Sequence, residues 1–287
     1  MHKAHKKAFN ERQLRILKRI VRRNPQYSSI QIRQELSYFM NPTPSAPTIR
    51  RYLFRLGLKS FVARRKPLLT QTMKTKRLQW CRKFQNKPIN FWDKIIFSDE
   101  CRIDLFNYRG RQMVRRLSSD NPFQSQYLKK SVKHSPSIMI WGCFNAQGTG
   151  RLEIIDGILN SDDYLNILKD KMLPSADYFG IRNQFIFQDD SAPIHRAKKI
   201  KKWFAENNIE QLPWPANSPD LNPIENIWKI LKHKVARANP KTIIELKKAI
   251  IRIYREEISP KICEDLVSSM QRRIQAVITN NGGQTKY

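Results

Sequence analysis

Residues 213–228 read PWPANSPDLNPIENIW. The proline-rich first half is typical of a loop, and the apolar periodicity of the second half predicts a helix over about 223–238. Asn222 fits the N-cap of this helix and Pro223 its first position. Glu225 falls at the third position, where it would complete a capping box. We therefore expect a shaped loop that leads into a helix with Glu225 in its first turn.

Short runs rich in β-branched and aromatic residues come before this helix and are expected to be strands. They are 94–98, 137–144, 152–155 and 184–188. Helical patterns separate the later runs and follow the last of them. These patterns cover about 161–173, 194–207 and, with a break at Ser259-Pro260, 243–278. Strands that later alternate with helices predict an α/β fold, a mixed sheet with flanking helices.

Three carboxylates stand at the ends of these elements. Asp99 follows the strand KIIFS in the phrase FSDE, and Asp190 follows the strand QFIF in QDDSAPIH. Glu225 lies in the first turn of the helix described above. Strand ends at one edge of a sheet, beside a helix start, can bring three such side chains together. Each also has a structural interpretation, since Asp99 and Asp190 can cap local turns and Glu225 can cap its own helix.

A cluster of carboxylates repels itself unless cations lie between its members. Hard oxygen ligands of this kind suit Mg²⁺ or Mn²⁺. Two such ions about 3.5–4 Å apart can activate a water or a 3′-hydroxyl and stabilise the leaving oxygen. The chemistry indicated is cleavage and transfer of a phosphodiester bond.

The charge of the chain points to a polyanionic partner. The 287 residues carry a formal net charge of +30, and residues 1–80 hold 20 Lys and Arg against two Glu. Nucleic acid is the usual partner of such an excess, and an anionic membrane surface is the weaker alternative. There is no apolar stretch of the roughly 18–20 residues that a transmembrane helix needs, and the N-terminus has no apolar signal core. We expect an intracellular, soluble protein.

The basic segment is expected to form three short helices. The first covers about 11–23, the second opens at Ser28 with a capping box to Gln31, and the third covers about 48–56 before Gly57. This layout is typical of a helix-turn-helix, whose last helix enters the major groove. The basic residues expected to contact DNA from it are Arg50, Arg51 and Arg55. The alternative is a three-helix bundle with a solvated basic face.

Residues 61–92 are expected to be a basic linker between the helix-turn-helix domain, 1–60, and the α/β domain, 93–287. Arg64, Arg65 and Lys66 in this segment could contact phosphates, act as a nuclear-import signal or keep the linker solvated. The four cysteines are scattered without zinc-ligand spacing and are expected to be reduced thiols.

Four phrases resemble the catalytic domain of Tc/mariner superfamily DNA transposases. They are FSDE, QDDSAPIH, WGCF followed by GTG, and above all PANSPDLNPIENIW, and the match runs from about Arg51 to the final TKY. In that family about ninety residues separate the two aspartates, and thirty-four separate the second from the glutamate. Here 90 residues lie between Asp99 and Asp190 and 34 between Asp190 and Glu225. The spacing selects Asp190 rather than Asp189.

The resemblance implies a ribonuclease-H-like fold and an enzyme that excises a DNA element and joins its 3′-hydroxyls to target DNA. It implies that Asp99, Asp190 and Glu225 hold Mg²⁺ or Mn²⁺, with two ions expected. It further implies double-stranded DNA partners (terminal inverted repeats and a TA-containing target), a homodimer on DNA and, in a eukaryotic host, a nuclear location. The alternatives are a transposase-derived DNA-binding protein without useful catalysis, or another ribonuclease-H-like nuclease.

The chain departs from the family pattern in several places. The usual phrase QDNxPxH here has an additional aspartate, Asp189, before the catalytic position and Ser191 after it, while His195 matches. The role of Asp189 is open. A glycine run that is frequent before SIMIWGCF is replaced by KHSPS. Family members usually carry two helix-turn-helix units, and this chain has room for one, which matches the second.

Overall fold

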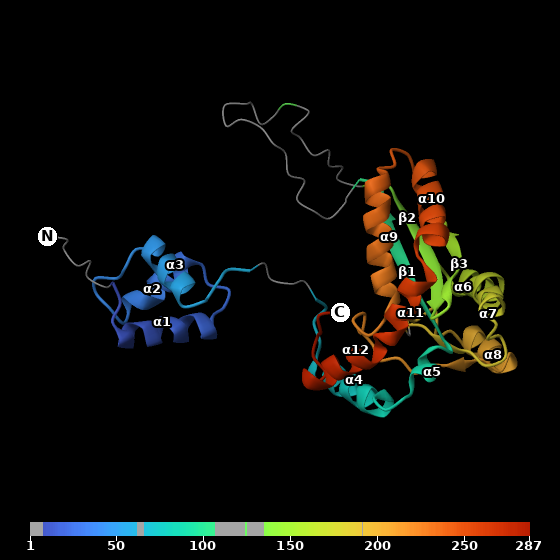
Figure 1. Cartoon of the computed structure of the whole chain (residues 1–287), viewed down its shortest axis with the longest axis horizontal. Helices are drawn as coiled ribbons and strands as arrows, with labels where there is room; N and C mark the ends of the chain where they lie inside the picture. Colours follow the sequence, from blue (N-terminus) through green and yellow to red (C-terminus); the bar gives the residue numbers. More distant parts are fainter. Residues whose placement is uncertain (1–7, 62–65, 107–123, 125–134, 191) are drawn as a thin grey trace. The chain divides into compact units, whose positions relative to one another are not determined.

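A computed structural model describes residues 8–61, 66–106, 124, 135–190 and 192–287. The chain forms two compact units, Met1–Arg65 and Lys66–Tyr287 (Figure 1). The first unit ends close to the predicted boundary at residue 60. The second begins much earlier than residue 93.

The first unit contains the three predicted helices, α1 (Glu11–Arg23), α2 (Ser29–Ser37) and α3 (Ala46–Arg55). Ser28 and Gln31 form the expected capping box of α2. Gly57 has a φ of +76°, the left-handed conformation predicted after the third helix. The core of the unit is made by Phe9, Leu17, Ile20, Ile32, Leu36 and Ile49.

The segment expected as a linker is structured over much of its length and belongs to the second unit. It contains α4 (Gln71–Phe84) and the short α5 (Ile89–Trp92). Trp80, Phe84 and Trp92 are buried in the larger core of the second unit. The basic composition of the segment hid an aromatic face, so the linker expectation is corrected from Lys66 onward.

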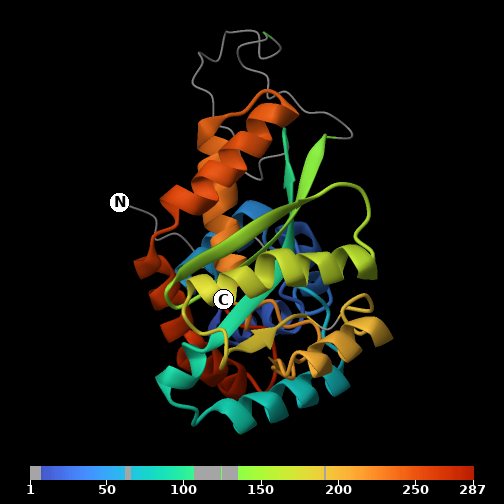
Figure 2. The ribbon, with the colours of Figure 1, turned by 90° about the vertical axis from the view of Figure 1, so that its right-hand side faces the viewer.

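The second unit is built on a five-stranded mixed sheet in the order β3-β2-β1-β4-β5 (Figure 2). The strands are β1 (Ile95–Asp104), β2 (Ser137–Asn145), β3 (Gly148–Ile155), β4 (Ile186–Gln188) and β5 (Glu210–Gln211). The central β1 pairs antiparallel with β2 and parallel with β4. The end of β4 therefore lies beside the first half of β1, where Gln188 pairs with Phe97, two residues before Asp99.

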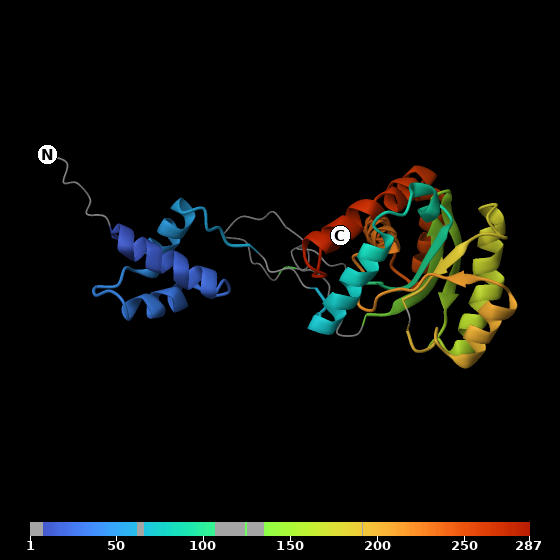
Figure 3. The same cartoon turned by 90° about the horizontal axis from the view of Figure 1, so that it is seen from below.

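Helices cover both faces of the sheet, as Figure 3 shows. One layer holds α6 (Ser161–Ile167), the π-helical turn Leu168–Met172, α7 (Leu173–Tyr178) and α8 (Lys198–Glu206). The other holds α4, α9 (Ile224–Ala238), α10 (Ile243–Arg252), the π-helical turn Ile253–Glu257, α11 (Pro260–Ser268) and α12 (Met270–Thr279). No helix in the described parts of the chain is long and apolar enough to cross a membrane.

The alternation of β1 separates two cores. Phe97 and Cys101 pack with the layer of α9, whereas Ile96 packs with the layer of α6. Because side chains of a strand alternate between its faces, Asp99 lies on the α9 face and its neighbour Glu100 on the α6 face. All four cysteines are free and buried, as expected.

Candidate functional site

Asp99 lies in the middle of β1, paired in register with Gly142 of β2. Its carboxyl is largely enclosed, and the amide of Glu100 donates a 2.9 Å hydrogen bond to it. Burial, followed by the negative charges of Glu100 and Glu225, raises the pKa of Asp99 well above its ordinary value, and Asp190 acts in the same direction. The structure therefore brings Glu225 and Asp190 into electrostatic range of Asp99.

Gly142 explains part of the WGCF phrase. A Cβ at this position would lie 2.8 Å from Cη2 of Trp228 and 3.0 Å from the hydroxyl of Tyr254. Trp228 is buried on α9. The missing side chain lets α9 approach the sheet directly opposite Asp99.

Glu225 occupies the first turn of α9, but the expected capping box is not formed. Pro223 is the N-cap, with no side-chain capping bond, and the helix begins at Ile224. The side-chain Nδ2 of Asn222 donates a 3.4 Å hydrogen bond to the carbonyl of Ser98. Oδ1 of Asn222 also accepts a 3.4 Å hydrogen bond from the backbone amide of Ile224. The long-range contact ties the start of α9 to the residue before Asp99.

A buried arginine of α4 anchors the loop before α9. Arg77 of α4 forms two 2.8 Å hydrogen bonds to Asp220, and both side chains are fully buried. Arg77 also donates to the carbonyls of Gly282 and Gly283, while Thr285 donates to Asp220. Within the phrase PANSPDLNPIENIW, Asp220 thus anchors the loop to α4 and to the C-terminal segment.

A second buried arginine reaches the helix start itself. Arg273 of α12 donates to the carbonyl of Asp220 at 2.9 Å and to Oδ1 of Asn226 at 2.7 Å. Asn226 directly follows Glu225. The two arginines and Asn222 therefore fix the backbone from which Glu225 projects. Sequence reasoning had not paired the two arginines with this loop.

Asp190 follows β4, and half of its side chain is exposed. Its Oδ1 accepts a 2.8 Å hydrogen bond from the amide of Ala192 and lies 2.9 Å from Nδ1 of His195. The interaction with His195 lowers the pKa of Asp190 against the opposing effect of burial. The local capping interpretation is therefore present in the structure, together with a contact to His195.

His195 is buried between two carboxylates. Its Nε2 lies 3.4 Å from Oε1 of Glu100, and its ring stacks on Tyr164 with centroids 4.2 Å apart. Burial alone lowers the pKa of His195, but the contacts with Asp190 and Glu100 raise it to about 10. Neighbouring Asp189 is buried, 3.4 Å from Arg196 and from Gln211. Asp189 thus contacts Arg196 and Gln211, and its charge also acts on His195.

The carboxylates of Asp99, Asp190 and Glu225 are the type of ligand that a hard divalent cation prefers, but they do not form a complete metal site. Among the described residues, no group of three or more His, Cys, Asp or Glu side chains is placed to hold a metal ion. Neither Asp99 nor Glu225 forms a salt bridge within the described residues, and burial followed by the charges of Glu100 and Glu225 raises the pKa of Asp99. Both described contacts of Asp190 use Oδ1, which leaves Oδ2 for a cation. A cation would relieve the repulsion that the three carboxylates now share.

The basic residues expected to contact DNA are partly described. Arg50, Arg51 and Arg55 are exposed on α3, and Lys66 is exposed at the start of the second unit. Arg64 and Arg65 lie outside the described residues. The positions on α3 are compatible with a recognition helix.

Sequence reasoning missed a basic stripe on α1, defined by Arg15, Lys18, Arg19, Arg22 and Arg23, which line a groove of about 460 Å³. All five are exposed and follow helical spacing, opposite the buried Leu17 and Ile20. None forms a salt bridge within the described residues. The stripe is a surface of unneutralised positive charge.

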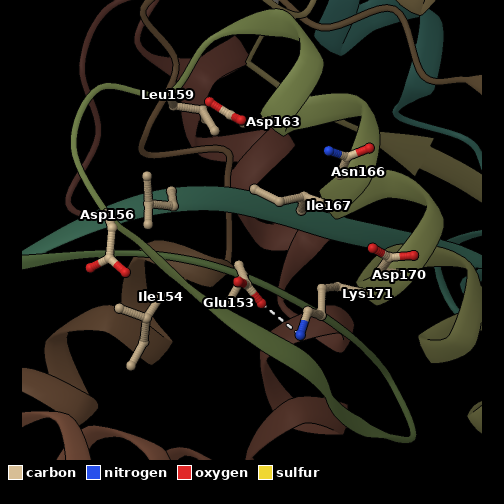
Figure 4. A pocket seen from close by; sticks show the side chains of 10 residues that line it. Glu153, Ile154, Asp156, Leu159, Asp163, Asn166, Ile167, Asp170 and Lys171 are labelled. Carbon is tan, nitrogen blue, oxygen red and sulfur yellow. Dashed lines mark ion pairs between the residues drawn. The ribbon is translucent and has the colours of Figure 1, made fainter.

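A cavity of about 400 Å³ lies between β3 and α6 (Figure 4). Four of its ten lining residues are acidic, and Lys171 within it forms a 2.6 Å ion pair with Glu153. None of the three candidate carboxylates lines it. It is separate from the site on β1 and α9.

Comparisons with known proteins agree with this architecture. A family model described as "Transposase" matches residues 14–86, and one described as "DDE superfamily endonuclease" matches residues 94–247. The structure resembles the Mos1 transposase paired-end complex with left transposon end, with a TM-score of 0.82 at 18% identity over 100% of this chain and 82% of that one. The second unit thus has a ribonuclease-H-like fold, preceded by a helix-turn-helix domain.

Sequence relatives narrow the class. The Tcb2 transposase of Caenorhabditis briggsae and the Tc1 transposase of Caenorhabditis elegans are each 33% identical over 270 residues, 94% of this chain and 98% of theirs. The Tc3 transposase of Caenorhabditis elegans is 32% identical over 223 residues, 77% of this chain and 65% of that one. The chain belongs to the Tc1/mariner-type family of DDE transposases. The expected absence of a first helix-turn-helix unit stays a prediction.

Proposed function

We propose that this chain is a metal-dependent DNA transposase that cuts the ends of a mobile element and joins the 3′-hydroxyls to target DNA. The observation that carries the proposal is the convergence of β1, the end of β4 and the start of α9. Burial and the charges of neighbouring carboxylates, Glu225 and Asp190 among them, raise the pKa of Asp99 there. Carboxylates whose charges act on one another in a chain of net charge +30 suit a role as cation ligands.

In this proposal Asp99, Asp190 and Glu225 hold two Mg²⁺ or Mn²⁺ ions. Structures of the Mos1 paired-end complex with Mg and with Mn support the choice of metals. Bound ions would activate the attacking oxygen and stabilise the leaving oxygen. The protein contributes position: Asn222, Arg77 and Arg273 hold the backbone around Glu225, and His195 holds Asp190.

The proposal includes a homodimer that brings two element ends together, insertion at TA dinucleotides and, in a eukaryotic host, a nuclear location. The exposed arginines of α3 and the match to a transposase helix-turn-helix model support binding to the ends. Light scattering of the protein–DNA complex tests the homodimer. Sequencing of insertion sites tests the TA preference, and fluorescence imaging of the tagged chain tests the nuclear location.

The central test is strand cleavage and strand transfer with Mg²⁺ or Mn²⁺. Asp99→Asn, Asp190→Asn and Glu225→Gln are each expected to reduce both activities at least 100-fold, because each removes a charged ligand without changing shape. Asp156→Asn is the matched control, since the Asp156 side chain is 86% exposed and lies on the acidic cavity. Wild-type activity in all three variants would exclude the assigned site.

A DNA-binding protein without useful catalysis is the second candidate. The observation that favours it is the engagement of Asp190 by His195, together with the absence of a finished ligand set among the described residues. Duplex binding with no cleavage in either metal, by a folded wild-type chain, would support this candidate.

A further inference from the structure

The segment 282–287 lies against the loop that leads to Glu225. Thr285 donates two hydrogen bonds to Oδ2 of Asp220, one from its backbone amide at 3.1 Å and one from its hydroxyl at 3.0 Å. The same carboxylate accepts the two hydrogen bonds of Arg77. Asp220 is therefore held by α4 and by segment 282–287 together.

Tyr287 covers the second arginine that holds this loop. The guanidinium of Arg273 lies over the Tyr287 ring, 4.7 Å from its centroid, and an arginine in this position is attracted to the aromatic face. Only 1% of Arg273 is exposed, and its guanidinium donates to Oδ1 of Asn226 at 2.7 Å. Because Asn226 directly follows Glu225, the ring restrains the arginine that fixes the first turn of α9.

The segment is also fastened at both of its ends. Arg77 donates to the carbonyls of Gly282 and Gly283 at 2.9 and 3.1 Å. Lys66, the first residue of the second unit, donates a 2.6 Å hydrogen bond to the carbonyl of Tyr287. The segment therefore has a fixed course, which keeps its side chains against the loop.

We propose that Thr285 and Tyr287 are positioning residues for Glu225. Thr285 acts through Asp220. Tyr287 acts through Arg273. In this role neither side chain contacts DNA, so the loss of either one moves the Glu225 carboxylate without removing a ligand. A displacement of about 1 Å at a catalytic group can reduce its rate about 100-fold. The inference rests on the proposed function, because it takes Glu225 as a ligand of the metals.

Hydrogen exchange of the metal-free, full-length protein tests the restraint without turnover. The amides of Glu225 and Asn226 are hydrogen-bonded to carbonyls just before α9. Thr285→Val keeps the shape of the side chain but loses its hydroxyl, so these two amides should exchange at least about 10-fold faster than in wild type. Thr285→Ser keeps the hydroxyl and should exchange like wild type.

Thr149→Val is the matched control for the loss of a threonine hydroxyl. It removes a hydroxyl that donates to the carbonyl of Tyr254 in the same unit, at a half-buried position like that of Thr285. Exchange at the two amides should stay unchanged in this variant. Unchanged exchange in Thr285→Val, or an equal increase in Thr149→Val, overturns the proposal.

Two substitutions of Tyr287 test the contact of its ring. Tyr287→Phe keeps an aromatic face over Arg273 and should exchange like wild type. Tyr287→Leu removes that face, so the amides of Glu225 and Asn226 should exchange faster. Equal exchange in the two variants overturns the role given to Tyr287.

Kinetics separate positioning from DNA binding. Thr285→Val and Tyr287→Leu are expected to lower kcat for strand cleavage at least about 10-fold and to leave the KM for duplex DNA unchanged. A raised KM with an unchanged kcat indicates a role in binding and overturns the proposal. If wild type cuts no DNA in either metal, the proposed function fails, and hydrogen exchange still decides whether the two residues hold Glu225.

Discussion

The guanidinium of Arg77 meets the carboxylate of Asp220 through two 2.8 Å hydrogen bonds, 143 residues apart in sequence and fully buried. Removing one partner of such a pair leaves an uncompensated charge and costs about 3–5 kcal/mol. We expect this loss in Asp220→Asn, measured by denaturant unfolding. Asp177→Asn, which breaks an exposed pair with Arg182, should cost at most about 1 kcal/mol.

The pair also predicts a pH dependence. Burial acts to raise the pKa of Asp220, but the hydrogen bonds and charge of Arg77 lower it overall below 3.8. A depressed folded-state pKa contributes stability that is present above the unfolded value and is lost as pH falls through the folded value. Below about pH 3.8, wild type should therefore lose this contribution while Asp220→Asn does not. Parallel stability curves for the two proteins in that range would contradict the assignment.

Asp99 should behave in the opposite way. Burial and the charges of Glu100 and Glu225 raise its pKa, so its ionised form is disfavoured in the folded state. Stability held back by Asp99 at neutral pH is regained as pH falls through its folded pKa. We expect Asp99→Asn to be more stable than wild type at pH 7 without metal, and inactive. Glu206→Gln, an exposed carboxylate on α8, is the control and should leave both properties unchanged. If Asp99→Asn were less stable than wild type, favourable contacts of the ionised carboxylate would outweigh its burial and the repulsion by its neighbours.

The parts of this molecule that the sequence predicted are those controlled by neighbours along the chain. The capping box of Ser28 and Gln31 and the left-handed Gly57 depend on three or four consecutive residues, and both were expected. The polar residues of β1 after Ser98 join the sheet because β2 pairs with them, and no local pattern shows that pairing. Arg77 looks like a solvated charge until Asp220 is placed beside it.

The site divides in the same way. Spacing and resemblance selected Asp99, Asp190 and Glu225, and the fold carries all three to adjoining elements. The contacts of Asn222 with Ser98 and of His195 with Glu100 join segments about 100 residues apart. Side-chain partners at that separation follow from the packing of the whole unit. The capping box that the sequence offered as an alternative role for Glu225 is not formed, because Pro223 is the N-cap and has no side-chain capping bond.

Gly142 tests the packing that brings α9 to β1. Alanine there would place a Cβ 2.8 Å from Trp228, and overpacking of this kind costs about 1–3 kcal/mol. We expect Gly142→Ala to lose that stability and to cut more slowly, because the Glu225 helix is pushed from Asp99. Trp228→Phe removes the atom that clashes. The double variant should therefore lose less unfolding free energy than the sum of the losses in the two single variants. Additive effects would contradict the contact.

His195 tests the support of Asp190. Its pKa is raised to about 10 by Asp190 and Glu100 despite burial. The stability it contributes should be full below about pH 6.5 and lost as pH rises towards 10. Hydrogen bonds to charged groups contribute roughly 1.5–3 kcal/mol, so His195→Gln should lose that amount at pH 6 and less at pH 10. An equal loss at both values would indicate packing against Tyr164 as its main role.

The like charges of the basic stripe of α1 should destabilise the chain when DNA is absent. Binding to DNA phosphates should remove this destabilisation. Like charges three or four residues apart on a helix destabilise it by about 0.2–0.5 kcal/mol per pair. Lys18 and Arg22 together take part in three such pairs, with each other, with Arg15 and with Arg19. The double change to Gln should therefore raise the free energy of unfolding by about 1 kcal/mol. If the stripe binds phosphates, it should also make the dependence of log K on log salt shallower by about two. A gain in stability with unchanged salt dependence would show that the stripe is solvated, and DNA contact would then rest on α3 and the second unit.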